Sequence, residues 1–126
     1  MPRVLFVDDN DAVRDVMTEL ISAYKYDVVP TETAELAISI LESDSSFDIL
    51  FTDIRLGIGH SGIWLARKVQ SEYPHMAIVL TTGYSSALPR WPIPWPIVQK
   101  PTTGQVIVSM FEHVLAEKHS GSPSPA

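Results

Sequence analysis

The sequence contains no cysteine, few basic residues and no long apolar run. Without cysteine, disulfides, thiolate metal sites and thiol nucleophiles are all excluded. The chain carries 9 Lys and Arg against 15 Asp and Glu, for a net charge of −6, so we expect no direct contact with nucleic acid, which needs clustered basic residues. The apolar runs are far shorter than the roughly 20 residues of a membrane span. Met1-Pro2-Arg3 leads directly into an apolar segment rather than a signal peptide, so we expect a cytoplasmic protein without membrane contact.

The length of 126 residues is enough for one hydrophobic core and too short for two. We therefore expect one domain over residues 1–118. The last residues, 119–126, are rich in serine and proline and are expected to form a flexible tail.

Short apolar segments alternate along the chain with stripes of helical periodicity. The segments are rich in β-branched residues and apolar on both faces, which is typical of strands in a covered parallel sheet. They lie at residues 4–7, 28–29, 49–51, 78–80 and 97–98, and the stripes at residues 13–24, 36–41, 63–69 and 106–115. The order predicts an α/β fold with a doubly wound five-stranded parallel sheet. The apolar positions of the first stripe are expected to lie mostly in the core.

The segment before the fifth strand lacks the helix that this order calls for. Residues 85–96, SSALPRWPIPWP, include four prolines, and each removes a backbone donor and disfavours helix for its predecessor. We predict that the fourth helix is shortened to about one turn near residues 85–88 or is missing. Trp91 and Trp95 then either form an exposed patch for a partner or pack over the edge of the sheet, and we favour packing.

Polar side chains stand where four of the predicted strands end. Asp8 and Asp9 follow the first strand, Asp53 ends the third, Thr82 the fourth and Lys100 the fifth. In open α/β sheets such groups face a crevice at the carboxyl ends of the strands. Two carboxylates about 4 Å apart repel by about 4 kcal/mol at an effective dielectric constant of 20. A divalent cation would remove this repulsion, and oxygen ligands favour Mg²⁺ or Mn²⁺ over zinc.

Each of these residues also has a structural explanation when taken singly. Aspartate after a strand is a common helix cap, threonine can satisfy backbone groups, and lysine is a common surface charge. Three acids, a hydroxyl and a lysine at the ends of four strands are harder to attribute to chance.

The motifs FVDDN, FTDIRL, TTG and QKP, in this order, resemble those of the receiver domain of two-component response regulators, from Arg3 to about Lys118. The resemblance implies a flavodoxin-like (βα)5 fold. It also implies a signalling phosphoacceptor, not an enzyme, that takes a phosphoryl group from a histidine kinase or a histidine phosphotransfer protein. Family members usually dock the kinase on the first helix. The downstream target is not encoded in the sequence.

The resemblance assigns chemical roles to several of these residues. Asp53 is the expected phosphoacceptor, Thr82 is expected to hydrogen-bond the phosphoryl group and Lys100 to pair with it. Gly83 leaves space for the phosphodonor. The bond between Lys100 and Pro101 is expected to be cis.

The resemblance also implies a metal site and two residues that tune the phosphoryl group. Asp9, Asp53 and the backbone carbonyl of Arg55 are expected to bind Mg²⁺ or Mn²⁺ directly, with Asp8 acting through water. Arg55 and Tyr84 occupy positions that set the phosphoryl lifetime in the family. Their bulk predicts slow self-dephosphorylation.

Two other functions compete with this interpretation. A pseudo-receiver would keep the fold but act as a phosphorylation-independent interaction module through its Pro/Trp segment, residues 89–96. An aspartate-nucleophile phosphatase would need a DxD arrangement and a cap domain, and Asp53-Ile54-Arg55 fails the first requirement. The loop after Asp53, IRLGIGHSG, also departs from the family pattern, because Gly57 replaces the usual proline and the loop looks one residue longer.

Overall fold

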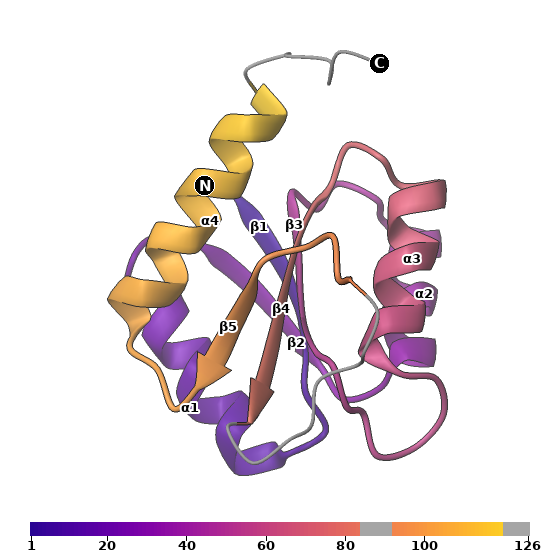
Figure 1. Ribbon diagram of the computed structural model, residues 1–126, viewed down its shortest axis with the longest axis horizontal. Helices are drawn as coiled ribbons and strands as arrows, with labels where there is room; N and C mark the ends of the chain where they lie inside the picture. Colours follow the sequence, from indigo (N-terminus) through magenta and orange to yellow (C-terminus); the bar gives the residue numbers. More distant parts are fainter. Residues whose placement is uncertain (84–91, 120–126) are drawn as a thin grey trace.

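The computed structural model describes residues 1–83 and 92–119 and contains five strands in one sheet (Figure 1). The strands are β1 (Arg3–Val7), β2 (Asp27–Thr31), β3 (Ile49–Asp53), β4 (Ala77–Gly83) and β5 (Ile97–Lys100). All pairs are parallel and the order is β2-β1-β3-β4-β5, which is the flavodoxin-like order predicted from the sequence. The order reverses between β1 and β3, so a crevice opens at their carboxyl ends.

Four helices lie among the described residues: α1 (Asp11–Ser22), α2 (Ala34–Ser43), α3 (Gly62–Glu72) and α4 (Gly104–His119). All four begin after a side chain that accepts a hydrogen bond from a backbone N–H in the first turn. Asn10 caps α1, Thr33 caps α2, Ser61 caps α3 and Thr103 caps α4. Such caps satisfy backbone donors that have no partner within the helix, so these starting points are local properties of the sequence.

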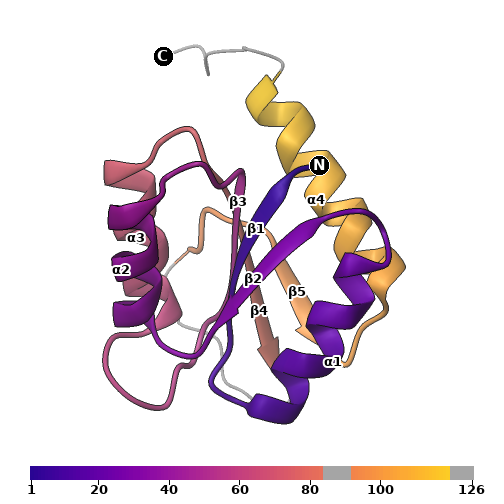
Figure 2. The same ribbon diagram turned by 180° about the vertical axis from the view of Figure 1, so that it is seen from behind.

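The helices cover the sheet on both faces. Helices α1 and α4 lie on one face, and α2 and α3 lie on the other (Figures 1 and 2). The strands alternate accordingly: Val4 and Phe6 are buried with the α1 and α4 residues, and Leu5 and Val7 are buried with the α2 and α3 residues. Because both faces are covered, the central strands are apolar throughout, as their sequences predict.

The apolar stripe of α1 is only partly in the core, contrary to the prediction. Met17 and Ile21 are buried, but Val16 and Leu20 are 58% and 37% exposed. Tyr24, the last residue of the predicted stripe, lies beyond the end of α1 at Ser22 and is 46% exposed. The stripe is wider than the surface that the sheet and α4 cover, so its outer edge remains in contact with solvent. This exposed edge adjoins the groove discussed below.

The described part of the Pro/Trp segment, residues 92–96, is not helical. Ile93, Trp95 and Ile97 alternate along it and are partly buried against the core on the α2 and α3 face. Trp95 therefore packs on the sheet, as favoured from the sequence. Trp91 and the predicted helical turn at residues 85–88 lie outside the described residues.

Two further expectations concern the ends of the chain and membranes. Helix α4 includes His119, one residue beyond the expected domain limit, and residues 120–126 lie outside the described residues. None of the helices in residues 1–83 and 92–119 has the length and apolar character needed to cross a bilayer.

Candidate functional site

The polar residues predicted to share a crevice converge at the carboxyl edge of the sheet. Asp8 follows β1 directly, Asp53 is the last residue of β3 and Lys100 the last residue of β5. The strand register places Asp53 beside Thr81 and Gly83 beside Lys100. Residues from four segments of the chain, separated by up to 92 positions, are thus brought together at one edge.

Three carboxylates form the centre of this site. Asp8, Asp9 and Asp53 each offer an oxygen atom, and these atoms all lie within 4.8 Å of one another. Asp8 is fully buried and Asp53 is 8% exposed, whereas Asp9 lies at the surface. The buried position of two like charges predicts strong repulsion unless cations lie nearby.

Lys100 supplies one such positive charge. Its Nζ atom lies 2.9 Å from Oδ2 of Asp53 and 3.1 Å from Oδ2 of Asp8, so one ammonium group donates to both buried carboxylates. The lysine side chain is only 18% exposed, which limits the screening of these charges by water.

Backbone N–H groups bond one further oxygen of each of the three carboxylates. Asn10 donates to Oδ1 of Asp8 at 2.9 Å, Arg55 to Oδ1 of Asp53 at 3.1 Å and Gly57 to Oδ2 of Asp9 at 2.9 Å. Each carboxylate therefore has a fixed orientation before any ligand arrives.

The ionisation of Asp53 and Lys100 reflects these contacts. Burial raises the pKa of the Asp53 carboxyl, and the hydrogen bond and charge of Lys100 oppose this effect without cancelling it. Burial would lower the pKa of Lys100, but its hydrogen bond to Asp53 and the charges of Asp53 and Asp8 outweigh burial and raise the pKa. The lysine thus stays protonated at neutral pH and stabilises the ionised form of Asp53.

The chemistry of the cluster fits a hard divalent cation. The three side chains offer oxygen atoms only, with no histidine or cysteine among them. Mg²⁺ and Mn²⁺ prefer such carboxylate ligands and retain water in part of their coordination shell. The exposure of Asp9 leaves a path for a hydrated ion. The N–H of Arg55 donates to Asp53, and the metal-binding role of its carbonyl stays a prediction.

The other predicted residues lie around this cluster. Thr82 is 4% exposed and its hydroxyl donates to the carbonyl oxygen of Gly83 at 3.4 Å. The bond between Lys100 and Pro101 is cis, as the resemblance implied. Arg55 is exposed beside the crevice, and Tyr84 lies outside the described residues.

Two glycines of the site were not identified as functional from the sequence. Gly57 supplies the N–H group that holds Asp9. Gly62 begins α3, and a Cβ atom there would lie 1.9 Å from the backbone oxygen of Asp53. A glycine directly before the helical stripe of residues 63–69 was the available signal for this close approach.

Replacing Gly62 by alanine is therefore expected to lower the free energy of unfolding by about 2–3 kcal/mol. The added Cβ meets backbone atoms of Asp53 and Ile54, which cannot move without displacing the end of β3. Chemical denaturation measures the change. Gly57→Ala is the control, because its Cβ would meet only the exposed side chain of Asp9, and we expect a loss below about 1 kcal/mol. Equal stability of the two variants would contradict the steric argument.

Comparison with known proteins identifies the family. The model of the response regulator receiver domain matches residues 4–89. The chain is 31% identical over 87 residues to the transcriptional regulatory protein ComA of Bacillus subtilis, which covers 67% of this chain and 40% of ComA. It is 26% identical over 84 residues to the response regulator protein FleR of Pseudomonas aeruginosa, which covers 67% of this chain and 17% of FleR. The chain thus spans less than half the length of either relative.

Solved structures show the same fold. The N-terminal domain of a response regulator/sensory box/GGDEF protein from Carboxydothermus hydrogenoformans matches with a TM-score of 0.83 and 22% identity, covering 96% of this chain and 99% of that domain. A CheY-like receiver domain protein from Methanospirillum hungatei matches with a TM-score of 0.80 and 23% identity, covering 95% and 98% of the two chains. These structures show the fold, and the family match over residues 4–89 shows that the chain belongs to the response regulator receiver domain family.

Proposed function

We propose that this receiver domain accepts a phosphoryl group on Asp53 from a histidine kinase or histidine phosphotransfer protein, in a reaction that depends on Mg²⁺. The observation that carries the proposal is the placement of the Asp53 carboxylate. It lies at the end of β3, 2.9 Å from the Lys100 ammonium group and within reach of two further carboxylates. A nucleophile, a fixed cation and a set of metal ligands in one crevice are what phosphoryl transfer needs.

In the proposed reaction a carboxylate oxygen of Asp53 attacks the phosphorus atom of the phosphohistidine. The bond between phosphorus and the histidine nitrogen breaks, the electron pair of that bond stays on the nitrogen, and an acyl phosphate forms on Asp53. The Lys100 ammonium group neutralises charge on the transferred oxygens. Thr82 follows Thr81, the residue of β4 that pairs with Asp53, and its hydroxyl is proposed to bond a phosphoryl oxygen. Gly83 presents no side chain to the incoming donor.

The acidic cluster is proposed to hold the metal ion. Asp9, Asp53 and the carbonyl of Arg55 would bind it directly, and Asp8 would act through water. When bound, Mg²⁺ neutralises phosphoryl oxygens during transfer. The N–H groups of Asn10, Arg55 and Gly57 already orient the three carboxylates for this task.

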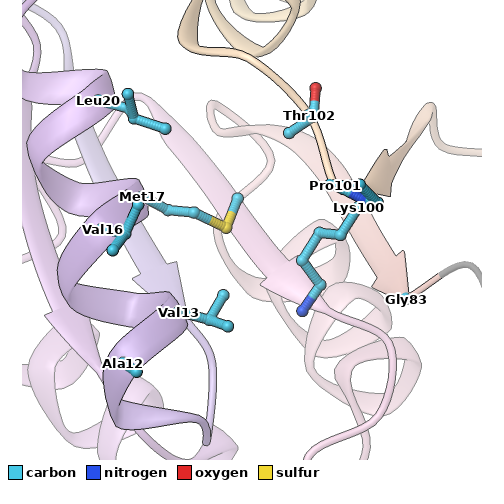
Figure 3. A pocket seen from close by; sticks show the side chains of 9 residues that line it. All are labelled: Ala12, Val13, Val16, Met17, Leu20, Gly83, Lys100, Pro101 and Thr102. Carbon is cyan, nitrogen blue, oxygen red and sulfur yellow. The ribbon is translucent and has the colours of Figure 1, made fainter.

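The phosphodonor protein is proposed to dock on the groove between α1 and the β5–α4 loop, shown in Figure 3. The lining residues are Ala12, Val13, Val16, Met17, Leu20, Gly83, Lys100, Pro101 and Thr102. The groove is mostly apolar and ends at Lys100 and Gly83, which belong to the phosphorylation site. A helix seated on the exposed edge of α1 would therefore bring its phosphohistidine to Asp53.

We also propose the bounds of the domain, its location in the cell and the kind of partner it has. Residues 1–118 form the receiver domain, which acts as a signalling phosphoacceptor in the cytoplasm rather than as an enzyme. Its downstream target is a protein, and its net charge of −6 disfavours direct binding to nucleic acid.

Intact-protein mass spectrometry tests the proposal. After incubation with acetyl phosphate and Mg²⁺, we expect a mass gain of one phosphoryl group, and no gain when a chelator removes the metal. Because small phosphodonors fail on some competent sites, a titration with beryllofluoride accompanies the experiment. If neither reagent reacts, the proposal is contradicted and the pseudo-receiver, acting through residues 89–96, is favoured instead.

Arg55 is proposed to slow hydrolysis of the acyl phosphate. Its side chain is exposed two positions after Asp53, where its bulk hinders an approaching water molecule. The Arg55→Asn variant is therefore expected to lose its phosphoryl group several-fold faster, as measured by the decay of the phosphorylated mass. An unchanged rate of dephosphorylation would count against the shielding role.

A further inference from the structure

The loop between β3 and α3, residues 54–61, connects the phosphorylation site to α2. Its second part, residues 57–61, is exposed. Two long-range hydrogen bonds tie this exposed part to other elements. The N–H of Gly57 donates to Oδ2 of Asp9, and the N–H of His60 donates to Oε2 of Glu35 at 2.9 Å. Gly57, at the start of this exposed part, thus contacts the acidic cluster, and His60, near its end, contacts the first turn of α2.

The contact at Glu35 is built by several residues. The hydrogen bond from the His60 N–H lowers the pKa of the Glu35 carboxyl. Gly59 has a φ of 79°, and a Cβ atom there would lie 2.4 Å from Oε1 of Glu35, so only glycine lets the loop lie against this carboxylate. The His60 ring stacks on Trp64 of α3, with ring centres 3.7 Å apart and planes inclined by 9°. The loop is therefore held between α2 and α3.

Asp9 is the member of the acidic cluster that most needs this support. Asp8 and Asp53 are buried and each bonds the Lys100 ammonium group. Asp9 is exposed, and the hydrogen bond that orients it comes from the loop. Oδ2 of Asp9 accepts the N–H of Gly57, so the direction of this carboxylate depends on where the loop holds that N–H. Any movement of the loop changes the direction of this ligand.

We propose that Glu35 is a positioning residue for the metal site, an inference that rests on the proposed function. By holding the His60 N–H, it fixes the loop, and the fixed loop keeps the Gly57 N–H on Asp9. The carboxylate of Asp9 is then oriented before Mg²⁺ arrives, which saves the ordering that binding would otherwise require. Partners that orient metal ligands directly change metal affinity by about 10- to 100-fold, and an effect transmitted through a loop is expected to be smaller.

A Mg²⁺ titration of the full chain followed by NMR tests this role. In Glu35→Ala we expect the dissociation constant for Mg²⁺ to rise roughly three- to tenfold. In the metal-free protein the His60 and Gly57 amides are expected to exchange with solvent faster than in the unchanged protein. The phosphorylation rate at saturating Mg²⁺ is expected to stay the same, while the Mg²⁺ concentration for half the maximal rate rises. A variant that had lost its fold would not combine an unchanged maximal rate with a raised Mg²⁺ requirement.

Two variants serve as controls. Glu35→Gln keeps an oxygen that accepts the His60 N–H but removes the charge, so its Mg²⁺ affinity is expected to stay within about twofold of the unchanged protein. Glu42→Ala removes the same charge from the exposed surface of α2, away from the loop, and is expected to have no effect.

The outcomes separate this inference from the proposed function. If Glu35→Ala binds Mg²⁺ as tightly as the unchanged protein, the positioning role is wrong and the proposed function is unaffected. If Glu35→Gln is as weak as Glu35→Ala, charge rather than the hydrogen bond is responsible, and the inference is overturned. If the unchanged protein binds no Mg²⁺, both fail.

Discussion

The Asp53→Asn variant is expected to take up phosphoryl groups from acetyl phosphate at least roughly 10³-fold more slowly than the unchanged protein, so that no gain in mass is detected. The amide has nearly the shape of the carboxylate, but its oxygen is a far weaker nucleophile. The variant therefore removes the reacting group with little change in packing. Intact mass, measured over time in the presence of Mg²⁺, gives the rate.

Stability separates loss of chemistry from loss of folding in this variant. Because burial raises the pKa of Asp53, folding favours its protonated form, and ionisation at neutral pH destabilises the fold. This contribution to stability is present below the ordinary pKa of 3.8 and is lost as the pH rises through the raised value. Asparagine has no such dependence. In metal-free buffer at neutral pH, Asp53→Asn is therefore expected to be at least as stable as the unchanged protein.

Asp15→Asn is the matched control, because it removes the same charge from an exposed position of α1. It is expected to react at the normal rate. If Asp53→Asn still gains a phosphoryl group while remaining folded, another residue is the acceptor and the proposed function must be revised.

Lys100→Met is expected to reduce the rate of phosphorylation by about 10²- to 10³-fold, the usual effect of removing one fixed charge or donor from a transition state. Methionine keeps the length and the apolar stem of lysine. It removes the ammonium group that lies 2.9 Å from Asp53 and 3.1 Å from Asp8. The pKa of Asp53 rises further, because the hydrogen bond and the charge of Lys100 both lower it. Less of the nucleophile is then ionised.

The affinity for Mg²⁺ distinguishes a role of Lys100 in the transition state from a role in holding the metal. Loss of a nearby positive charge does not weaken attraction between the cluster and a cation, so Lys100→Met is expected to bind Mg²⁺ at least as tightly as the unchanged protein. Lys68→Met is the control for charge, because Lys68 is half-buried on α3, where it pairs with Glu72. A rate for Lys100→Met within about threefold of the control would exclude a transition-state role for Lys100.

Much of the architecture was predictable because its signals are local. The short apolar segments predicted all five strands. The positions of Asn10, Thr33 and Ser61, just before helical stripes, are typical of helix caps. The burial of α1 was predicted less well. Its stripe has helical periodicity, yet Val16 and Leu20 are exposed, because periodicity marks the apolar side of a helix and not how much of that side is covered.

The acidic site was predictable for a related reason. Parallel strands end at one edge, so residues such as Asp8, Asp53 and Lys100 had to lie near one another once the strand order was known. Their types indicated the chemistry. The sequence did not indicate which atoms meet, and the contacts of Lys100 with both carboxylates became visible only in the structure.

The sequence by itself determined the sheet, the helix starts and the residue types at the site, since periodicity, capping and strand ends depend on neighbours along the chain. Only the tertiary structure decided that Gly62 lies against the backbone of Asp53, that Gly57 holds Asp9 and that Glu35 holds His60. The Gly57 and Glu35 contacts join residues 48 and 25 positions apart. Their geometry depends on how the β3–α3 loop packs between two helices, and no local pattern encodes that packing.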